Sequence, residues 1–391
     1  MKLLILASHP VQYHAPYFRE ISKRILEKGG QCKVIYLSDF SMQGYKDTGF
    51  GATIKWDSDL MDGYDYCVLD SSKKNNPSFF DLRSLGFMDR VKEYQPTLIL
   101  FTTLNYIGAI NALIACRLRL IPCAVRVETN DMANFRGVLK TIMRDLYFRA
   151  VYSCFKFAIA IGTLNRQHLS RLGVKKIETA YYAHPDFCNS YSEEEKQCLY
   201  KNTRKSMDLS DRDIVLLFCG KLTVKKNPTL LMDKLNSLPD ELKNRLFFLF
   251  VGDGELRSQI EHKAKGLGLR SLVTGFKQQN ELAPYYLCSN IFYLCSQQKG
   301  ETWGLVVNNA IYAGLPCIIS SHVGCSADVG DKEHMYIINE ADTLKFHQMI
   351  HQYANFQRNF HLHQAWQDDF STYNSAKKTV DFLTGSVSTK L

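Results

Sequence analysis

Short apolar runs alternate with longer segments of helical spacing along nearly the whole chain. Most of the runs are continuous stretches of Val, Ile, Leu and Phe with no regular polar alternation. Strands that are covered on both faces, as in parallel sheets, have this pattern. The predicted strands are Leu3–Ser8, Cys32–Ser38, Tyr64–Asp70, Thr97–Thr103, Pro122–Val127, Phe157–Gly162, Ile177–Ala183, Ile214–Lys221, Leu246–Asp253, Leu272–Phe276, Ile291–Ser296, Pro316–Ser320 and Met335–Asn339.

The segments between these runs are long enough for crossover helices, as at Tyr106–Arg119 and Thr229–Leu238. Such alternation predicts an α/β fold with doubly wound parallel sheets. The chain becomes polar and charged after residue 188, so we place a linker at 189–212. We therefore expect two Rossmann-like domains facing a cleft, at 1–188 and 213–370, and a C-terminal helix within 371–391 that packs back toward the N-terminal domain.

Composition narrows the class of protein. The 391 residues are 46% apolar and 22% charged, which excludes a disordered chain, a collagen-like repeat and a small disulfide scaffold. The twelve cysteines are scattered without a Cys-x-x-Cys pair, so zinc ligation is not indicated, and free thiols fit a reducing cytoplasm. No apolar run is long enough to predict a membrane span.

The positive charge is concentrated in one segment. The net charge is +9, and residues 136–176 hold nine Lys or Arg against the single acid Asp145. This segment is either a solvated helix face or a surface that attracts anions. Bulky apolar and basic residues alternate over 135–149 at helical spacing, which favours an anionic membrane surface over nucleic acid. The residues expected to face a membrane are Arg136, Lys140, Arg144 and Arg149.

Three segments of the second half carry candidate chemistry. Gly220 ends a predicted strand, and Lys221 and Lys226 follow at a spacing that lets both reach one anionic group, such as a diphosphate. Gly252-Asp-Gly254 ends the next strand at the start of a helix, where backbone amides bind anions. Glu301 precedes a helix predicted from about Gly304 to Ala313. Taken singly, each has a plain alternative: solvated lysines, a tight turn or a helix cap.

In combination, these motifs resemble the retaining GT-B-fold glycosyltransferases of family 4, over essentially the whole chain. The resemblance rests on five stretches and on a Glu-x7-Glu signature whose second acid is here Asn309. Asparagine still forms hydrogen bonds but lacks the strength of a carboxylate, so a weaker ribose contact is expected. The stretches are His9–Glu20, Gly220–Lys226, Val251–Arg257, Thr274–Phe276 and Gly314–Ile318.

The resemblance implies roles for individual residues. Lys221 and Lys226 would hold the donor diphosphate, Glu301 would contact the donor sugar, and backbone at Thr302–Leu305 would meet sugar and phosphates. The residues expected to bind the donor are Gly220, Gly252, Asp253, Gly254, Phe276, Thr302, Trp303, Gly304, Leu305 and Asn309.

The first half departs from the family at the loop after the fifth strand, which has no His in Val125–Asp131. Glu128 or Asp131 could fill the polar role of that His at the cleft, and Glu128 is preferred because it lies nearer the strand end, with Asp131 on the acceptor side. The alternative for Glu128 is a structural pair with Arg126 or another nearby base. His9 and His14 follow the first strand. They could face the donor or the acceptor, and the alternative is that they have a structural role.

The expected function is transfer of a sugar from a nucleotide diphosphate sugar, with UDP favoured over GDP, to a saccharide or lipid-linked acceptor of a bacterial surface polysaccharide. The resemblance implies retention of configuration. No cofactor, metal or nucleic acid is expected, and the enzyme would work in the cytoplasm or at the inner face of the membrane. The alternatives are a nucleotide-sugar epimerase of the same fold and a non-catalytic nucleotide-sugar-binding partner.

Overall fold

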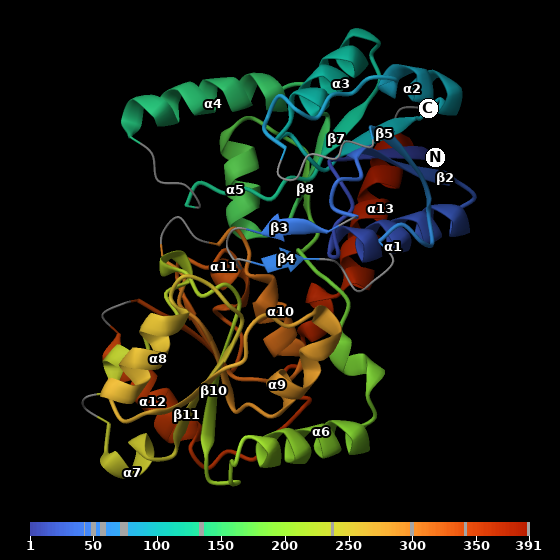
Figure 1. Ribbon diagram of the computed structural model, residues 1–391. Coiled ribbons are helices and arrows are strands. Elements are labelled where there is room, and N and C mark those ends of the chain that lie inside the picture. The colour runs from blue at the N-terminus through green and yellow to red at the C-terminus, as the bar shows by residue number, and fades with distance from the viewer. Residues whose placement is uncertain are drawn as a thin grey trace.

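The computed structural model describes residues 1–42, 44–47, 52–54, 60–70, 77–132, 137–235, 238–297, 301–339 and 342–388. These residues form two α/β domains, one above the other in Figure 1, each built on a parallel sheet. The doubly wound parallel architecture predicted from the apolar runs is confirmed.

The N-terminal sheet has seven strands: β1 (Lys2–Ala7), β2 (Gln31–Ser38), β5 (Asp65–Asp70), β6 (Leu98–Phe101), β7 (Cys123–Val125), β8 (Phe157–Ala160) and β9 (Ile177–Thr179). Their order is β5-β2-β1-β6-β7-β8-β9, and all neighbours are parallel. In β1, Leu3 pairs with Cys32 of β2 and Leu98 of β6. The side chains of β6, β7 and β8 are entirely buried, as continuous apolar runs require.

Helices cover this sheet: α1 (His14–Glu27), α2 (Phe87–Tyr94), α3 (Ile107–Leu118), α4 (Val138–Tyr152), α5 (Thr163–Arg171) and the last helix of the chain, α13 (Thr372–Ser388). Figure 1 shows α13, in red, beside α1 in the N-terminal domain. Ala376, Val380 and Leu383 of α13 are buried in one core with Phe18 of α1. The chain end therefore completes the N-terminal core.

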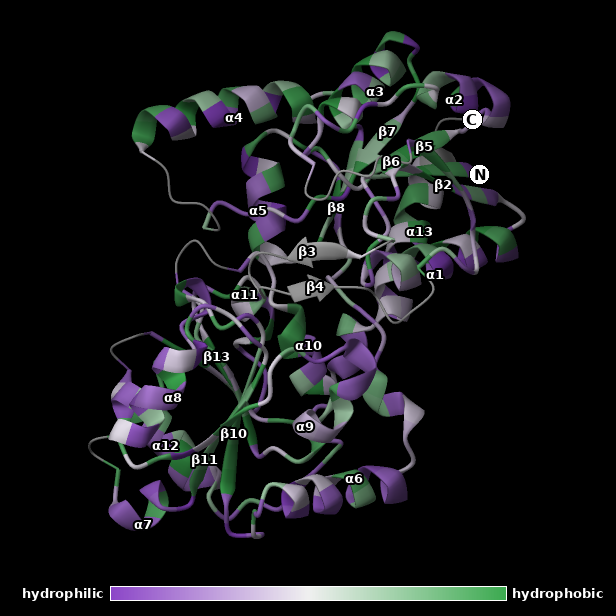
Figure 2. Cartoon of the chain, in the orientation of Figure 1, coloured by the Kyte–Doolittle hydropathy of each residue, from purple (hydrophilic) through white to green (hydrophobic). Residues whose placement is uncertain are grey.

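The C-terminal sheet has six parallel strands: β10 (Ile214–Cys219), β11 (Leu246–Val251), β12 (Arg270–Val273), β13 (Ile291–Leu294), β14 (Cys317–Ser320) and β15 (Met335–Ile338), in the order β12-β11-β10-β13-β14-β15. Figure 2 shows the central strands as mainly hydrophobic and α8 as largely hydrophilic. The helices are α6 (Glu193–Ser206), α7 (Asp240–Lys243), α8 (Arg257–Gly266), α9 (Ala283–Leu287), α10 (Leu305–Tyr312), α11 (Ser326–Val329) and α12 (Thr343–Tyr353).

Three segments differ from the sequence-based expectation. The segment at 189–212, expected as a linker, contains α6, whose buried Arg204 donates to Cys288 O at 3.0 Å in the C-terminal domain. Thr229–Leu238 contains a 3-10 turn, Met232–Lys234, in its described part instead of a full crossover helix. A short antiparallel hairpin, β3 (Tyr45–Asp47) and β4 (Ala52–Ile54), has no counterpart in the prediction.

The two domains pack directly on one another. Trp303 of the C-terminal domain is 2% exposed and lies so close to Gly162 that a Cβ there would be 2.3 Å from the indole. The Thr163 amide and hydroxyl donate to the Asp328 carboxylate at 3.0 and 2.7 Å. Asn308 donates to the carbonyl of Tyr182 at 3.0 Å. These contacts hold the two domains together. Within the described part of the chain, no helix is long and apolar enough to span a bilayer.

Candidate active site

The candidate site begins where β10 ends. Gly220 follows the strand with a φ of +141° and has open space where a Cβ would lie. Lys221, Lys225 and Lys226 come next, the last two in the 3-10 turn Val224–Lys226. The amide of Gln297, beyond β13, donates to Lys225 O at 2.9 Å, which holds this turn against the neighbouring strand end.

Lys226 pairs with Glu301, which the sequence places far away. The ammonium contacts the carboxylate, and the two side chains are only 19% and 16% exposed. Burial and the nearby charges of Lys225 and Lys221 lower the pKa of Lys226 to about 7, whereas the Glu301 carboxylate favours its protonated form. A positive group and a negative group thus share one crevice, and an anionic ligand would compete with Glu301 for the ammonium.

The turn after β11 supports the lysine loop. A Cβ on Gly252 would lie 1.9 Å from Gly220 O, and one on Gly254 would lie 2.6 Å from Leu222 O. The Leu222 amide donates to Asp253 O at 2.9 Å. The two glycines are therefore needed for close packing, because any side chain would push the lysine loop away.

The segment between Glu301 and α10 is held from both domains. Gly304 has a φ of +99°, and a Cβ there would lie 2.8 Å from Val323. From the N-terminal domain, Asn130 donates to Thr302 O at 3.2 Å, and His184 Nε2 lies 3.3 Å from Leu305 O. The backbone that would meet a donor is thus rigidly positioned.

Asn309, on α10, lies at a cavity of 660 Å³ between the domains. It is 2% exposed, and its Oδ1 has no hydrogen-bond partner among the described residues. A buried, unpartnered amide oxygen is costly unless a ligand uses it. The cavity is lined by Gln12, Tyr13, Pro16 and Arg19 of the N-terminal domain, by His184, Pro185, Asp186, Phe187 and Ser190 near the domain crossing, and by Gln279, Asn280, Leu282, Leu305, Val306 and Asn309.

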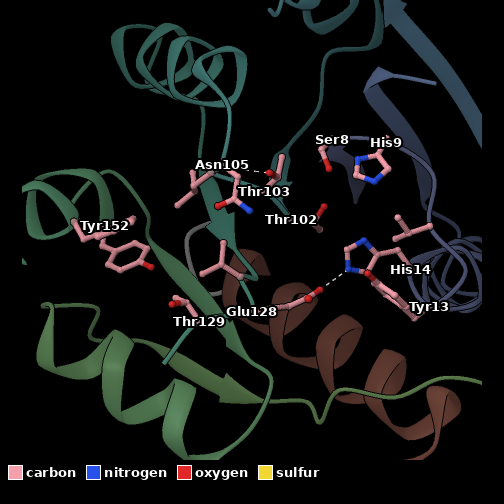
Figure 3. Close-up of a pocket in the computed structure, with 14 residues that line it drawn as sticks. Ser8, His9, Tyr13, His14, Thr102, Thr103, Asn105, Glu128, Thr129 and Tyr152 are labelled. Carbon is pink, nitrogen blue, oxygen red and sulfur yellow. Dashed lines mark hydrogen bonds and ion pairs between the residues drawn. The ribbon is translucent and has the colours of Figure 1, made fainter. Parts of the chain in front are cut away.

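A second, polar cavity of 270 Å³ lies at the carboxyl ends of the N-terminal strands (Figure 3). Such strand ends are the usual ligand sites of open α/β sheets. Tyr13 lines this cavity and the one between the domains, so the two are adjacent. The polar lining comes from Ser8 and His9 after β1, His14 at the start of α1, Thr102, Thr103 and Asn105 after β6, Glu128 and Thr129 after β7, and Tyr152 of α4.

His14 and Glu128 form a pair in this cavity. The distance from His14 Nε2 to Glu128 Oε1 is 2.7 Å. Burial acts to raise the pKa of Glu128, but the contact with His14 and the charge of Arg126 outweigh it, so the pKa is lowered. The carboxylate is ionised at neutral pH and accepts a hydrogen bond from Nε2, so the pair fixes the orientation of the His14 ring.

His9 also lines this cavity. Burial, together with the nearby His14, lowers the pKa of His9 to about 4, so the ring is neutral near pH 7. Its Nδ1 has no hydrogen-bond partner among the described residues. The ring packs against Phe40 with centroids 4.3 Å apart. A neutral imidazole beside hydroxyl groups suits an uncharged polar ligand.

Several residues expected at the site have other partners. The Asp131 carboxylate, expected on the acceptor side, contacts His168 at 2.7 Å and Arg171 at 2.7 Å and does not line the polar cavity. Arg144, expected to face a membrane, is 13% exposed and turns inward to Asp145 at 2.8 Å. Asp131 and Arg144 therefore belong to an ionic cluster in which each charge already has a partner.

Two residues expected to bind the donor also have partners within the protein. The Trp303 indole donates to Asn308 at 3.0 Å and stacks on Tyr181 within the domain contact. The Asp253 carboxylate contacts Arg257 of the same turn at 3.0 Å. Phe276 is half-buried after β12, beside the turn that contains Gly252. Arg136 lies outside the described residues.

Sequence reasoning missed Lys225, Tyr13 and Thr102. Lys225 and Tyr13 follow the ends of predicted strands and Thr102 lies in the last residues of one, and that position was the available signal. No group of three or more His, Cys, Asp or Glu suited to a metal ion occurs in the described ranges.

Comparisons with known proteins concern the fold and the class of protein. Residues 200–358 match the family model "Glycosyl transferases group 1". A relative from Campylobacter jejuni, named GalNAc-alpha-(1->4)-GalNAc-alpha-(1->3)-diNAcBac-PP-undecaprenol alpha-1,4-N-acetyl-D-galactosaminyltransferase, is 27% identical over 32% of this chain and 33% of its own length. The lipopolysaccharide glucosyltransferase WaaG of Escherichia coli is 24% identical over 47% of this chain and 50% of its own. This chain therefore aligns with half or less of each of these curated relatives.

A solved structure extends the likeness to the whole chain. Anabaena HepE in complex with UDP aligns with a TM-score of 0.69, 15% identity, and coverage of 98% of this chain and 100% of that one. Residues 200–358 are thus a glycosyltransferase group 1 domain, and the chain as a whole has the GT-B fold.

Proposed function

We propose that the protein transfers a sugar from a UDP-sugar to a saccharide or lipid-linked acceptor of a bacterial surface polysaccharide. The observation that carries this proposal is the contact between Lys226 and Glu301 at the carboxyl edge of the C-terminal sheet, beside Lys221 and Lys225. Lys226 and Glu301 are partly buried, so their charges act through a medium less polar than water, and Lys226 can bind an anion strongly.

The donor diphosphate takes the place of Glu301 beside Lys226. As the sugar–phosphate bond breaks, negative charge grows on the diphosphate, and the ammonium stabilises it without a metal ion. The released Glu301 carboxylate then accepts hydrogen bonds from hydroxyls of the transferred sugar. Charge stabilisation by lysine supports a metal-independent reaction, and the family resemblance supports retention of configuration.

The nucleoside of the donor lies toward the cavity between the domains. Asn309 Oδ1 is buried there without a partner, and a ribose hydroxyl would donate to it. The 660 Å³ cavity is large enough for a nucleoside, and the similar HepE structure contains UDP. These observations favour a UDP-sugar.

The acceptor occupies the polar cavity of the N-terminal domain. Its 270 Å³ is lined by hydroxyl, amide and neutral imidazole groups, which pair with sugar hydroxyls. His14, held by Glu128, orients the acceptor hydroxyl. The relatives whose names refer to diphosphate-undecaprenol and lipopolysaccharide favour a lipid-linked saccharide as acceptor.

A panel of nucleotides in thermal-shift measurements tests the proposal. UDP and UDP-sugars should raise the unfolding temperature, because a ligand that binds only the folded state stabilises it. GDP-sugars should raise it less, and the UDP effect should be lost in Lys226→Ala. A panel without any stabilising nucleotide would contradict the proposal. Release of an epimerised nucleotide sugar without an acceptor would identify an epimerase instead.

A further inference from the structure

The first turn of α5 has no side-chain cap of its own. Gly162 precedes the helix and has no side chain, so the amides at this end need an acceptor from elsewhere. The Asp328 carboxylate, on α11 of the C-terminal domain, accepts the Thr163 amide at 3.0 Å and the Thr163 hydroxyl at 2.7 Å. Figure 1 shows α5 directly above α11, at the boundary between the domains. One domain therefore caps a helix of the other, at the helix end where an anionic group is favourable.

Asp328 is buried in this contact. The residue is 8% exposed, and burial raises the pKa of its carboxyl, while the hydrogen bonds from Thr163 act to lower it. Separation of the two helix ends would take both Thr163 donors away from a buried acid, which is costly. The contact therefore favours one fixed arrangement of α5 against α11.

The Trp303 indole fills the space beside this contact. A Cβ on Gly162 would lie 2.3 Å from the indole and 2.8 Å from the Asp328 carboxylate, so a larger residue has no room there. The indole stacks on Tyr181 of the N-terminal domain, with ring centroids 5.9 Å apart, and donates to Asn308 of the C-terminal domain at 3.0 Å. Both domains thus form the seat of this side chain.

The segment Glu301–Trp303 is packed on the residues that lead into α11. Gly324, just before that helix, donates its amide to Glu301 O at 3.1 Å. A Cβ on Gly324 would lie 1.9 Å from Thr302 O, so the two backbones are in direct contact. The Glu301 side chain leaves this segment and contacts Lys226. The position of the carboxylate therefore depends on a segment that the N-terminal domain helps to hold.

We infer that the contact of α5 with α11 has a positioning role in sugar transfer: it seats Trp303 between the domains and thereby holds the Glu301 carboxylate beside Lys226. This inference rests on the proposed function, which assigns Glu301 to the donor sugar. A change in the N-terminal domain, outside both cavities, should then alter the charge state of a lysine in the C-terminal domain. The positioning residues are Gly162, Thr163 and Asp328.

Hydrogen exchange of the full chain, followed by mass spectrometry, tests the inference without a substrate. The reporters are the amides of Gly324 and Cys325, which donate to Glu301 O and Trp303 O. In Gly162→Ala the added methyl group must displace the indole, so these amides should exchange about tenfold faster or more. The matched control is Gly137→Ala, which should keep the wild-type rate. Gly137 also precedes a helix, α4, but has open space where a Cβ would lie.

Substitutions of Thr163 give the same comparison without added bulk, should Gly162→Ala fail to fold. Thr163→Val removes the hydrogen bond from the hydroxyl to Asp328 and should speed exchange of the reporter amides by about threefold. Thr163→Ser keeps the hydroxyl and should exchange at the wild-type rate.

The pH profile of kcat/KM is a second readout, which a merely local role of α5 would not change. A displaced Glu301 carboxylate no longer favours the protonated form of Lys226, so the pKa of Lys226 should fall. The ammonium is lost as the pH rises through this pKa. The alkaline limb should therefore move to lower pH in Gly162→Ala and stay in place in Gly137→Ala.

Wild-type exchange of the reporter amides in both Gly162→Ala and Thr163→Val would overturn the inference. Faster exchange confined to α5 and β8 would also overturn it, because the contact would then stabilise only its own domain. Should UDP never bind, the proposed function fails, whereas the exchange rates still decide whether the domain contact holds the Glu301 segment.

Discussion

The polar edges of the two sheets differ in charge, although the first six strands of each sheet have the same order. The C-terminal edge gathers Lys221, Lys225 and Lys226, and Lys226 contacts Glu301. The N-terminal edge gathers histidine, threonine and asparagine, and the carboxylate of Glu128 is held there by His14. The same α/β scaffold thus offers one edge suited to an anionic diphosphate and one suited to neutral hydroxyls. Ligand class is decided by side chains at strand ends, not by the fold.

The largest effect is expected from Lys226→Ala. The change removes the cation proposed to hold the diphosphate and leaves the Glu301 carboxylate, 16% exposed, without this partner. The value of kcat/KM should fall by about 100-fold or more, and UDP binding measured by calorimetry should weaken with it. Lys225→Ala is the matched control, because it removes a lysine from the same turn that does not contact Glu301. Equal losses in the two variants would show that general positive charge, not this contact, binds the donor.

Glu301→Gln tests the balance of charge at the same edge. Burial and two neighbouring lysines already lower the pKa of Lys226, and removal of the carboxylate should lower it further. The ammonium is lost as the pH rises through this pKa, so the alkaline limb of the pH profile of kcat/KM should move to lower pH. The rate at neutral pH should fall by about tenfold or more. An alkaline limb that stays in place would show that Lys226 does not control it.

His14→Gln tests the neutral edge. Transfer to acceptor should fall by about tenfold, while UDP binding and slow donor hydrolysis stay unchanged, because the pair lies in the N-terminal cavity. Glu128→Gln should have a similar effect, and the double variant should be little worse than either single one, since the two residues act as a unit. His262→Gln on the exposed face of α8 is the control. Fully additive losses would show that His14 and Glu128 act independently.

The smallest effect is expected at Asn309. Asn309→Ala should weaken UDP binding by about threefold to tenfold through loss of one hydrogen bond. Binding of 2′-deoxy-UDP, measured by the same titration, should be nearly equal in the variant and the wild type. A similar loss for both nucleotides would place Asn309 away from the ribose hydroxyl.

Most strands were predictable because their signal is local. Continuous apolar runs predicted the strands of both parallel sheets, although the observed strand ends differ by a few residues. For example, the strand predicted at Thr97–Thr103 is observed at Leu98–Phe101. The helix at 193–206 was missed because it is polar and lacks an apolar stripe. Its capping box, Ser192 with Glu195, was the visible signal.

The candidate site was predictable only in part. Glycine and lysine spacing identified the diphosphate loop, since each motif lies within a few residues. The sequence could not tell that the Trp303 indole is buried between the domains or that Asp131 contacts Arg171. Both depend on partners distant in the chain, so nothing in the local pattern distinguishes them from residues that bind a ligand.

By itself, the sequence determined the two parallel sheets and the cationic loop after β10, because hydrophobic periodicity and strand-end position are local properties. Only the tertiary structure decided which charges remain available. It paired Lys226 with Glu301, joined Arg144 to Asp145 in one ionic cluster, and left the apolar side chains of Leu139 and Met143 on α4 exposed. The physical reason is that burial and ion pairing depend on distances in space, which the order of residues does not specify.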